Sequence, residues 1–247
     1  MTTSSELDSF FNTLLQPERF KDFCPNGLQV EGRHEIKKIV SGVTASLAFI
    51  EAAMDAKADA IFVHHGIFWR GETRITGWMR KRVGRLIEQN INLFAYHLPL
   101  DAHPTLGNNA QLANVLGLHA TGRFGEQEIG WLGTSNAGTL GALCEQVQTK
   151  LVRSITAVGD AQRAVKNVAW CTGGAQGYFE AAIAAGADVY ITGEISEPQA
   201  HYAREMGVAY IACGHHASER YGAPAVAVHA AGHFGLQHEF IDIDNPA

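Results

Sequence analysis

Cysteine, long apolar runs and positive charge are all scarce in this sequence, and each scarcity removes a class of protein. The chain holds only four cysteines, Cys24, Cys144, Cys171 and Cys213, and none of them forms a Cys-x-x-Cys pair. Neither a zinc knuckle nor a thiol redox motif is therefore expected. No apolar run approaches the ~20 residues of a membrane span, and the amino terminus lacks the basic start and apolar core of a signal peptide. These features predict a cytoplasmic protein with reduced thiols.

The charge balance argues against a general nucleic-acid binder. There are 19 Lys and Arg against 25 Asp and Glu, a net charge of −6, whereas binding to phosphate backbones depends on clustered cations. The basic cluster of Arg80, Lys81, Arg82 and Arg85 has helical spacing, which is more typical of a solvated helix face than of a phosphate site. A local anion site there is the alternative. Nucleic acid is therefore not the expected partner.

What the sequence does contain is a repeated strand and helix pattern. Ile36 to Val43 predicts a strand, Leu47 to Ala56 a helix, and Ala60 to Val63 a second strand. The short connections favour a parallel β-α-β unit. A further helix and strand are predicted at Arg80 to Asn90 and Ile91 to Tyr96, and the pattern weakens beyond them, between residues 118 and 165.

The helix before the second strand recurs later in the chain. Residues 50–61 and 179–190 share Glu, four Ala and Asp at one constant offset. Chance similarity between Ala-rich helices would not also keep the flanking strands and loops in register. We therefore expect an α/β fold of two similar units, residues 1–124 and 166–247, joined by a connector at 125–165. A metal site is expected at the strand ends between the units, and a single continuous fold is the alternative.

Polar side chains gather where these predicted strands end, which is where open α/β sheets place their binding sites. His215 and Glu219 are four residues apart, so on a helix they share one face. The residues at the four strand ends are His64, His65, His97, Asp101, Glu194, His215, His216 and Glu219. Imidazoles and carboxylates are the ligands that zinc, iron, manganese and similar ions accept. These candidate ligands are too many for one tetrahedral ion. Two ions ~3.5–4 Å apart, as in two-metal hydrolytic sites, could bind them all.

The metal ligands expected from this convergence are His64, His65, Asp101, His215 and Glu219. His97 is either a further ligand or a residue that orients Asp101 or a bound water. The remaining histidines are interpreted as loop or surface residues, or lie near the last strand without a matching carboxylate. They are His34, His103, His119, His201, His229, His233 and His238.

Several ordered motifs together resemble the GTP cyclohydrolase 1 type 2 homologue family, also called the interacting-factor-three-like family. They are Asn26-Gly27-Leu28-Gln29-Val30-Glu31-Gly32, Val63-His64-His65-Gly66-x-Phe68-Trp69, His97-Leu98-Pro99-Leu100-Asp101 with Gly107-Asn108-Asn109, Thr192-Gly193-Glu194 and Gly214-His215-His216-x-x-Glu219. The resemblance runs from about residue 20 to the carboxyl terminus. The chain is too short to hold the extra domain that longer family members insert.

The resemblance implies a ring-shaped homohexamer of two-lobed α/β subunits, each with a dinuclear metal centre. By the family pattern, His64 and Asp101 hold one ion, His65 and His215 hold the other, and Glu219 bridges them. The family name implies hydrolysis of GTP at the guanine C8, assisted by neighbouring acid–base groups. Glu194 and His97 are the catalytic candidates, with His216 as a further proton-transfer candidate.

Three functions stay open on these grounds. The first is a metal-dependent hydrolase of a nucleotide-like or phosphorylated small molecule; without a P-loop, the ions and scattered side chains would have to hold the nucleotide. The second is a non-catalytic metal-binding or interaction protein that forms a ring. The third is a ring that encloses nucleic acid, which the acidic net charge opposes.

Overall fold

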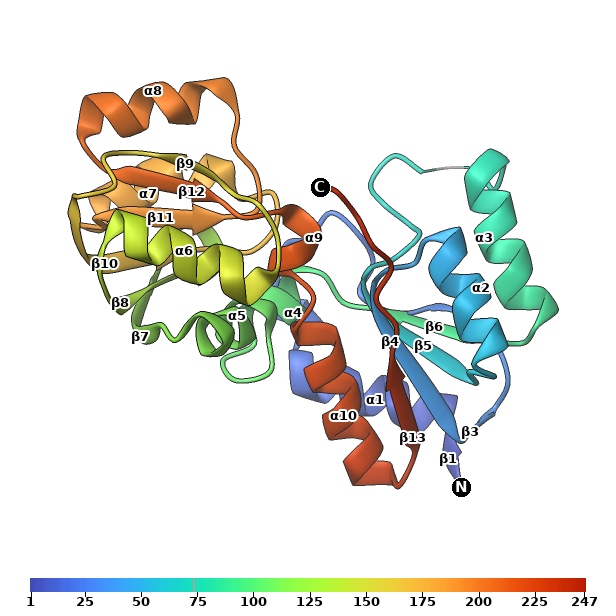
Figure 1. Cartoon of the computed structure of the whole chain (residues 1–247). Coiled ribbons are helices and arrows are strands. Elements are labelled where there is room, and N and C mark those ends of the chain that lie inside the picture. Colours follow the sequence, from blue (N-terminus) through green and yellow to red (C-terminus); the bar gives the residue numbers. More distant parts are fainter. Residues whose placement is uncertain (73) are drawn as a thin grey trace. The chain divides into compact units, whose positions relative to one another are not determined.

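The chain divides into two compact units, which we describe separately. The structure is a computed structural model that describes residues 1–72 and 74–247. The first unit comprises Met1–Gly107 and Arg220–Asp244, and the second comprises Asn108–Glu219 and Asn245–Ala247 (Figure 1). These bounds differ from the division 1–124, 125–165 and 166–247 that the sequence suggested, because the chain crosses to the second unit earlier and returns to the first before it ends.

The first unit is built on a five-stranded sheet in the order β13-β4-β5-β6-β2. Its strands are β2 (Gly27–Val30), β4 (Lys38–Thr44), β5 (Ala60–His65), β6 (Asn92–Ala95) and β13 (Gln237–Phe240). The neighbours β13, β4, β5 and β6 are parallel, and β2 pairs antiparallel with β6. A small second sheet pairs β1 (Thr2–Thr3) with β3 (Glu35–Ile36). The predicted parallel β-α-β unit is therefore present.

Helices cover both faces of this sheet. They are α1 (Ser4–Leu15), α2 (Leu47–Asp55), α3 (Gly77–Glu88), α4 (Leu98–Ala102), α10 (Gly222–Phe234) and the 3-10 turn η1 (Pro17–Arg19). Side chains alternate between the two faces of a strand. On β5, Ile61 and Val63 pack with α2 and α3, whereas Ala60 and Phe62 pack with α1 and α10. A strand buried on both faces reads as a continuous apolar run, which is why β5 was recognisable in the sequence.

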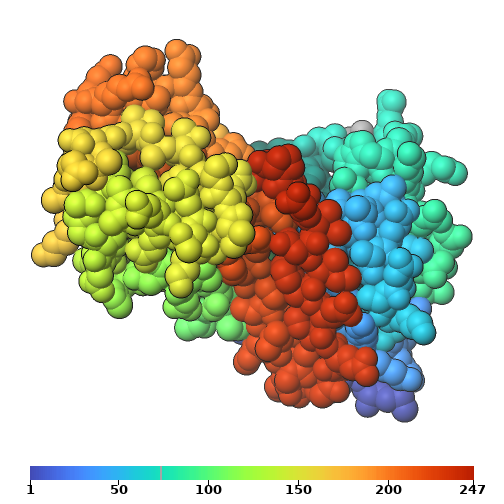
Figure 2. All heavy atoms as spheres, viewed as in Figure 1, coloured from blue at the N-terminus to red at the C-terminus, as the bar shows by residue number. Residues whose placement is uncertain are grey.

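Helix α10 explains why residues 220–244 belong to the first unit. Its small apolar side chains Ala223, Val226, Ala227 and Ala230 are fully buried in the core beneath the sheet. Strand β13 then adds to the edge of β4. Side chains of α10 and β13 form part of the surface of this unit, in red in Figure 2. The burial of α10 and the pairing of β13 are long-range, so sequence periodicity alone did not assign this segment to the first sheet.

The second unit is built on a six-stranded sheet in the order β7-β8-β10-β11-β12-β9. Its strands are β7 (His119–Phe124), β8 (Gly130–Thr139), β9 (Thr156–Val158), β10 (Ala164–Trp170), β11 (Val189–Thr192) and β12 (Ala209–Ala212). The central strands β10, β11 and β12 are parallel, and the outer ones are antiparallel to their neighbours. The expected connector at 125–165 thus supplies two strands of this sheet.

Helices of the second unit also lie on both faces of its sheet. They are α5 (Asn108–Leu116), α6 (Leu140–Leu151), α7 (Phe179–Ala184), α8 (Glu197–Met206), α9 (His215–Ser218), and the 3-10 turns η2 (Glu126–Glu128) and η3 (Gln176–Tyr178). Trp170 points to α5, where its indole Nε1 donates to the carbonyl of Asn109 at 3.0 Å. On the opposite face, Phe179 of α7 packs against Tyr190 and Tyr210.

The strand register is the same in the two β-α-β units. Val40 of β4 lies opposite Ile61 of β5, and Ala169 of β10 lies opposite Tyr190 of β11. The predicted α/β class is confirmed, with a mixed sheet in each unit. Among the helices of the described residues, none is long and apolar enough to cross a membrane.

Candidate metal centre

Three histidine rings and one carboxylate cluster at the carboxyl ends of the first unit's strands. His64 and His65 end β5, and their ring centroids lie 4.4 Å apart. His97 follows β6, with its ring 5.1 Å from that of His64. Asp101 on the short helix α4 is buried, and its Oδ1 lies 3.5 Å from Nε2 of His64. The predicted site residues that belong to the first unit therefore lie close together.

Hydrogen bonds orient these rings. Nδ1 of His64 lies 3.1 Å from the backbone carbonyl of Tyr96. Because a carbonyl only accepts, Nδ1 carries a proton, and Nε2 is the nitrogen that faces Asp101. Nδ1 of His65 lies 3.0 Å from Oγ1 of Thr44 at the end of β4. Metal-binding histidines are typically oriented in this way through the nitrogen that does not bind the ion.

The second unit places one histidine between two carboxylates. Nδ1 of His215 lies 2.6 Å from Oε1 of Glu194, which follows β11. Nε2 of the same ring lies 3.3 Å from Oε2 of Glu219, a buried residue that follows α9. His215 and Glu219 do share one face, as their spacing of four predicted. Glu194 therefore contacts His215 directly and holds its Nδ1 proton.

The loop after β10 leaves room for this arrangement. Gly173 has a φ of +70°, and a Cβ there would overlap the carboxylate of Glu219. Its N–H donates to Oγ of Ser218 at 2.9 Å, and its carbonyl accepts from the N–H of Gly193 at 2.8 Å. Only glycine adopts this backbone conformation without cost. The loop is thus built around the Glu219 carboxylate.

The two carboxylates determine the protonation of His215. Burial alone would lower the pKa of this imidazole, but the hydrogen bonds and negative charges of Glu219 and Glu194 raise it to about 9. In the absence of an ion, the ring is therefore protonated at neutral pH. A cation is thus already stabilised at this position, which a divalent ion would occupy with a larger charge.

The donor set and its spacing fit a divalent metal ion. Two ligands of one tetrahedral zinc, each at ~2.0–2.1 Å, are themselves about 3.3 Å apart. The pairs His64–Asp101 and His215–Glu219 have nitrogen to oxygen distances of 3.5 and 3.3 Å. Within the first unit, ligand atoms of His64, His65 and His97 also lie within 4.8 Å of one another. A cluster of histidines able to bind a metal ion is thus present in the first unit, and the second unit holds a His–Glu pair with ligand spacing.

Sequence reasoning missed Asp22. Its Oδ1 lies 2.7 Å from Nδ1 of His97, so the two form a hydrogen-bonded pair. The pair joins residues 75 positions apart, and no local pattern links them. The predicted loop residue His103 does lie in a loop, where its Nδ1 accepts from the N–H of Leu106 at 3.0 Å. His201 is exposed on α8, as expected.

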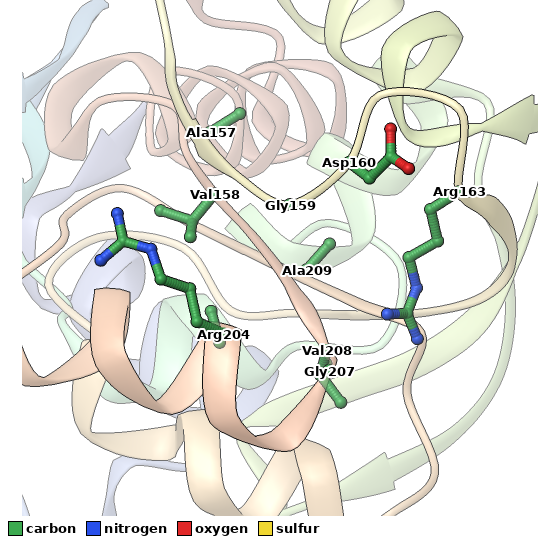
Figure 3. Close-up of a pocket in the computed structure, with 10 residues that line it drawn as sticks. Ala157, Val158, Gly159, Asp160, Arg163, Arg204, Gly207, Val208 and Ala209 are labelled. Carbon is green, nitrogen blue, oxygen red and sulfur yellow. The ribbon is translucent and has the colours of Figure 1, made fainter.

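A cavity of about 520 Å³ lies elsewhere in the second unit (Figure 3). It is lined by the turn Val158 to Asp160, by the end of α8, and by the first residue of β12, Ala209. Arg163 and Arg204 stand on either side of it in Figure 3. Because His215 follows the other end of β12, this cavity is not part of the candidate metal centre.

The fold and the clustered ligands define a mixed α/β protein of two units with candidate metal-binding residues at its strand ends. The model of the Duf34/NIF3 (NGG1p interacting factor 3) family matches residues 2–246. The chain belongs to this family, and the resemblance seen in the sequence motifs is confirmed.

Similar proteins of nearly equal length support this assignment. A GTP cyclohydrolase 1 type 2 homolog of Neisseria meningitidis serogroup B is 53% identical over 238 residues, which is 96% of each chain. Another, of Pseudomonas aeruginosa, is 48% identical over 242 residues, or 94% of each chain. The solved structure of protein ybgI, of unknown function, has a TM-score of 0.95 at 44% identity and covers 99% of this chain and 100% of its own. None of these relatives is longer by an inserted domain.

Proposed function

We propose that this protein binds two divalent metal ions and is a metal-dependent hydrolase of a nucleotide-like or phosphorylated small molecule. The observation that carries the proposal is the matched spacing of the two ligand pairs. In each unit, a histidine Nε2 faces a buried carboxylate at 3.5 or 3.3 Å, and the Nδ1 of the same ring is held by a hydrogen bond. This is the arrangement in which a histidine is ready to bind an ion.

The proposed ligands are His64 and Asp101 for one ion, His65 and His215 for the other, and Glu219 as the bridge between them. A shared Glu219 would give each ion three of these side chains, and a bridging carboxylate is a common feature of two-metal hydrolytic sites. Zinc, iron and manganese all accept this mixture of nitrogen and oxygen donors.

The catalytic candidates have different surroundings. Bound divalent ions would lower the pKa of water and polarise a substrate oxygen. His97 is not one of the five ligands, and its Nδ1 proton is held by Asp22, so its Nε2 is the nitrogen left to accept or return a proton. Glu194 holds the Nδ1 proton of His215. We therefore propose His97 as the proton-transfer residue and Glu194 as the residue that orients a ligand.

We also propose that the two units are copies of one ancestral β-α-β unit. The same strand register in β4–β5 and β10–β11 supports this, together with the shared Glu, Ala and Asp positions of residues 50–61 and 179–190. Duplication would account for a centre with ligands at the strand ends of both units. A homohexameric ring and a cytoplasmic location complete the proposal.

The alternative is a metal-binding interaction protein without turnover. Full coordination of the ions by protein side chains, with no exchangeable water, would favour this alternative. Both proposals predict bound ions, and only the first predicts product.

The test combines metal analysis with an activity screen. Purified protein is assayed for metal by mass spectrometry and for turnover of nucleotides, phosphodiesters and cyclic amides, beside Glu219→Ala. We expect two ions per chain in the wild type, none in Glu219→Ala, and hydrolysis only with ions bound. The matched control is Glu197→Ala, whose side chain is 88% exposed.

The outcomes separate the two functions. If the protein binds two ions but hydrolyses none of the substrate classes, the hydrolase proposal is refuted and the metal-binding interaction protein remains. Retention of two full equivalents by Glu219→Ala would refute the bridging assignment. Metal loss in the Glu197→Ala control would mean that the purification, and not the ligand set, decides the metal content.

A further inference from the structure

The Asp22 carboxylate lies in a loop before β2 and is held by an unusually complete set of donors. Its Oδ1 accepts from the N–H of Phe23 at 2.6 Å and faces Nδ1 of His97 at 2.7 Å. Its Oδ2 accepts from the N–H of Leu98 at 2.9 Å and from Nδ2 of Asn26 at 3.0 Å. Both oxygens are thus saturated, and the side chain is only 3% exposed.

These contacts determine which nitrogen of His97 carries the proton. An ionised carboxylate can only accept, so the Nδ1 that faces it must be the donor. Burial would raise the pKa of Asp22, but the hydrogen bond and charge of His97, with the Asn26 and Phe23 donors, lower it to about 2. The carboxylate is therefore ionised in the physiological range.

The backbone of His97 is held as well. Its N–H donates to Oδ1 of Asn26 at 2.7 Å, and Asn26 in turn is bound to Asp22. The ring contacts that of Trp69, edge-on at a centroid distance of 5.1 Å, and that of His64, also at 5.1 Å. Neither the ring nor the main chain can turn without breaking a short hydrogen bond.

A third metal site is the competing interpretation of this region. Ligand atoms of Asp22, Cys24 and His97 lie within 4.8 Å of one another. However, both oxygens of Asp22 already accept hydrogen bonds, and Nδ1 of His97 is one of the donors. Burial and the charge of Asp22 raise the pKa of the Cys24 thiol to about 12. Hydrogen bonds, and not an ion, already satisfy this group.

We propose that Asp22 is a positioning residue that holds His97 in the Nδ1–H tautomer, with the Nε2 lone pair presented at the strand ends beside His64. Asp22 and His97 are arranged like the carboxylate and imidazole of a catalytic triad, in which the carboxylate orients the ring that transfers the proton. The use of this pair in catalysis rests on the proposed hydrolase function, but the tautomer itself does not. Asp22 also connects the loop before β2 to the start of α4, so a purely structural role must be separated from the positioning role.

The tautomer is read directly by solid-state nitrogen-15 NMR of sedimented, histidine-labelled, zinc-loaded protein. His97→Gln identifies the His97 resonances by their loss. We expect the wild-type Nδ1 signal in the protonated range and Nε2 in the unprotonated range. In Asp22→Asn, whose amide group can donate to Nδ1, we expect the Nδ1–H form to be lost in most molecules.

Asp8→Asn is the matched control. Asp8 supports β2, the strand that follows this loop, by accepting from the N–H of Leu28 at 3.1 Å, and its other oxygen accepts from Nδ2 of Asn12. The control should keep the wild-type His97 signals even if its melting temperature falls. An Asp22→Asn spectrum identical to wild type would overturn the proposal.

The wild-type spectrum alone is also decisive. An unprotonated Nδ1 in His97 of the wild type would overturn the proposal even if Asp22→Asn did not fold. If the tautomer is as expected but no substrate is hydrolysed, the positioning role stands and the hydrolase function fails. If turnover is found, kcat should fall in Asp22→Asn by more than about 10-fold, with KM little changed.

Discussion

The two units present opposite chemistry on similar frameworks. The carboxyl ends of β5 and β6 carry three imidazoles and a single aspartate, His64, His65, His97 and Asp101. The corresponding ends of β11 and β12 in the second unit lead to His215, which lies between Glu194 and Glu219, and to the adjacent His216. One edge is rich in nitrogen donors and the other in negative charge.

This difference has a physical consequence for metal binding. An imidazole-rich edge lacks the charge to neutralise two divalent ions, whereas a carboxylate-rich edge has charge but few nitrogen ligands. Each unit is therefore short of one of the two kinds of ligand that a pair of divalent ions needs. The following predictions test that division, from the largest effect to the smallest.

Removing one ligand from the first unit should remove one ion and leave the other. Asp101→Asn is expected to lose the ion shared with His64, and His65→Ala the ion shared with His215, so each variant keeps about one equivalent. Metal content by mass spectrometry measures this, with the exposed His201→Ala as control. Loss of both ions from both variants would mean that the two sites are not separable.

Adding a methyl group to the second unit's loop should disturb its carboxylate. In Gly173→Ala, the positive φ costs about 1–2 kcal/mol, and the new Cβ must also displace Glu219. We expect a loss of at least about 2 kcal/mol in the free energy of unfolding, measured by urea denaturation, and weaker metal binding. Gly177→Ala is the matched control, since a Cβ there meets no atom within 4 Å. Equal stability of the two variants would contradict the close packing of Gly173 against the Glu219 carboxylate.

Neutralising the orienting carboxylate should weaken binding without removing a ligand. Glu194→Gln keeps the shape of the side chain but loses the charge that holds the Nδ1 proton of His215. Substitution of such orienting partners typically lowers metal affinity about 10–100-fold. Competition with a chelating dye measures the affinity, while the number of ions at saturation should not change. Reduced stoichiometry at saturating metal would instead make Glu194 a ligand.

Metal binding should release about one proton from His215 at neutral pH. Without ions the pKa of His215 is raised from its ordinary value of 6.5 to about 9. The ion pairs of His215 therefore stabilise the ion-free fold fully at pH values below 6.5. That contribution is lost as the pH rises through about 9. Metal must displace the proton, so affinity should increase with pH up to about 9. Calorimetry in buffers of different ionisation enthalpy counts the protons. No release at pH 7 would contradict the raised pKa.

Much of the candidate site in each unit was predictable because its signals are local. The apolar run of β5 ends at His64 and His65, and the four-residue spacing of His215 and Glu219 places them on one face. The parallel β-α-β plan also follows from periodicity and short connections. These features depend on neighbours within about one strand or one helical turn, which the order of residues displays directly.

Only the tertiary structure decided the remaining points. Asp22 meets His97 and Glu194 meets His215 through hydrogen bonds that span 75 and 21 residues. Residues 220–244 return to the first sheet because α10 buries its small side chains there. The sequence by itself determined which ligand types end which strands. Which carboxylate orients which ring depends on contacts between distant segments, and no periodic pattern encodes such contacts.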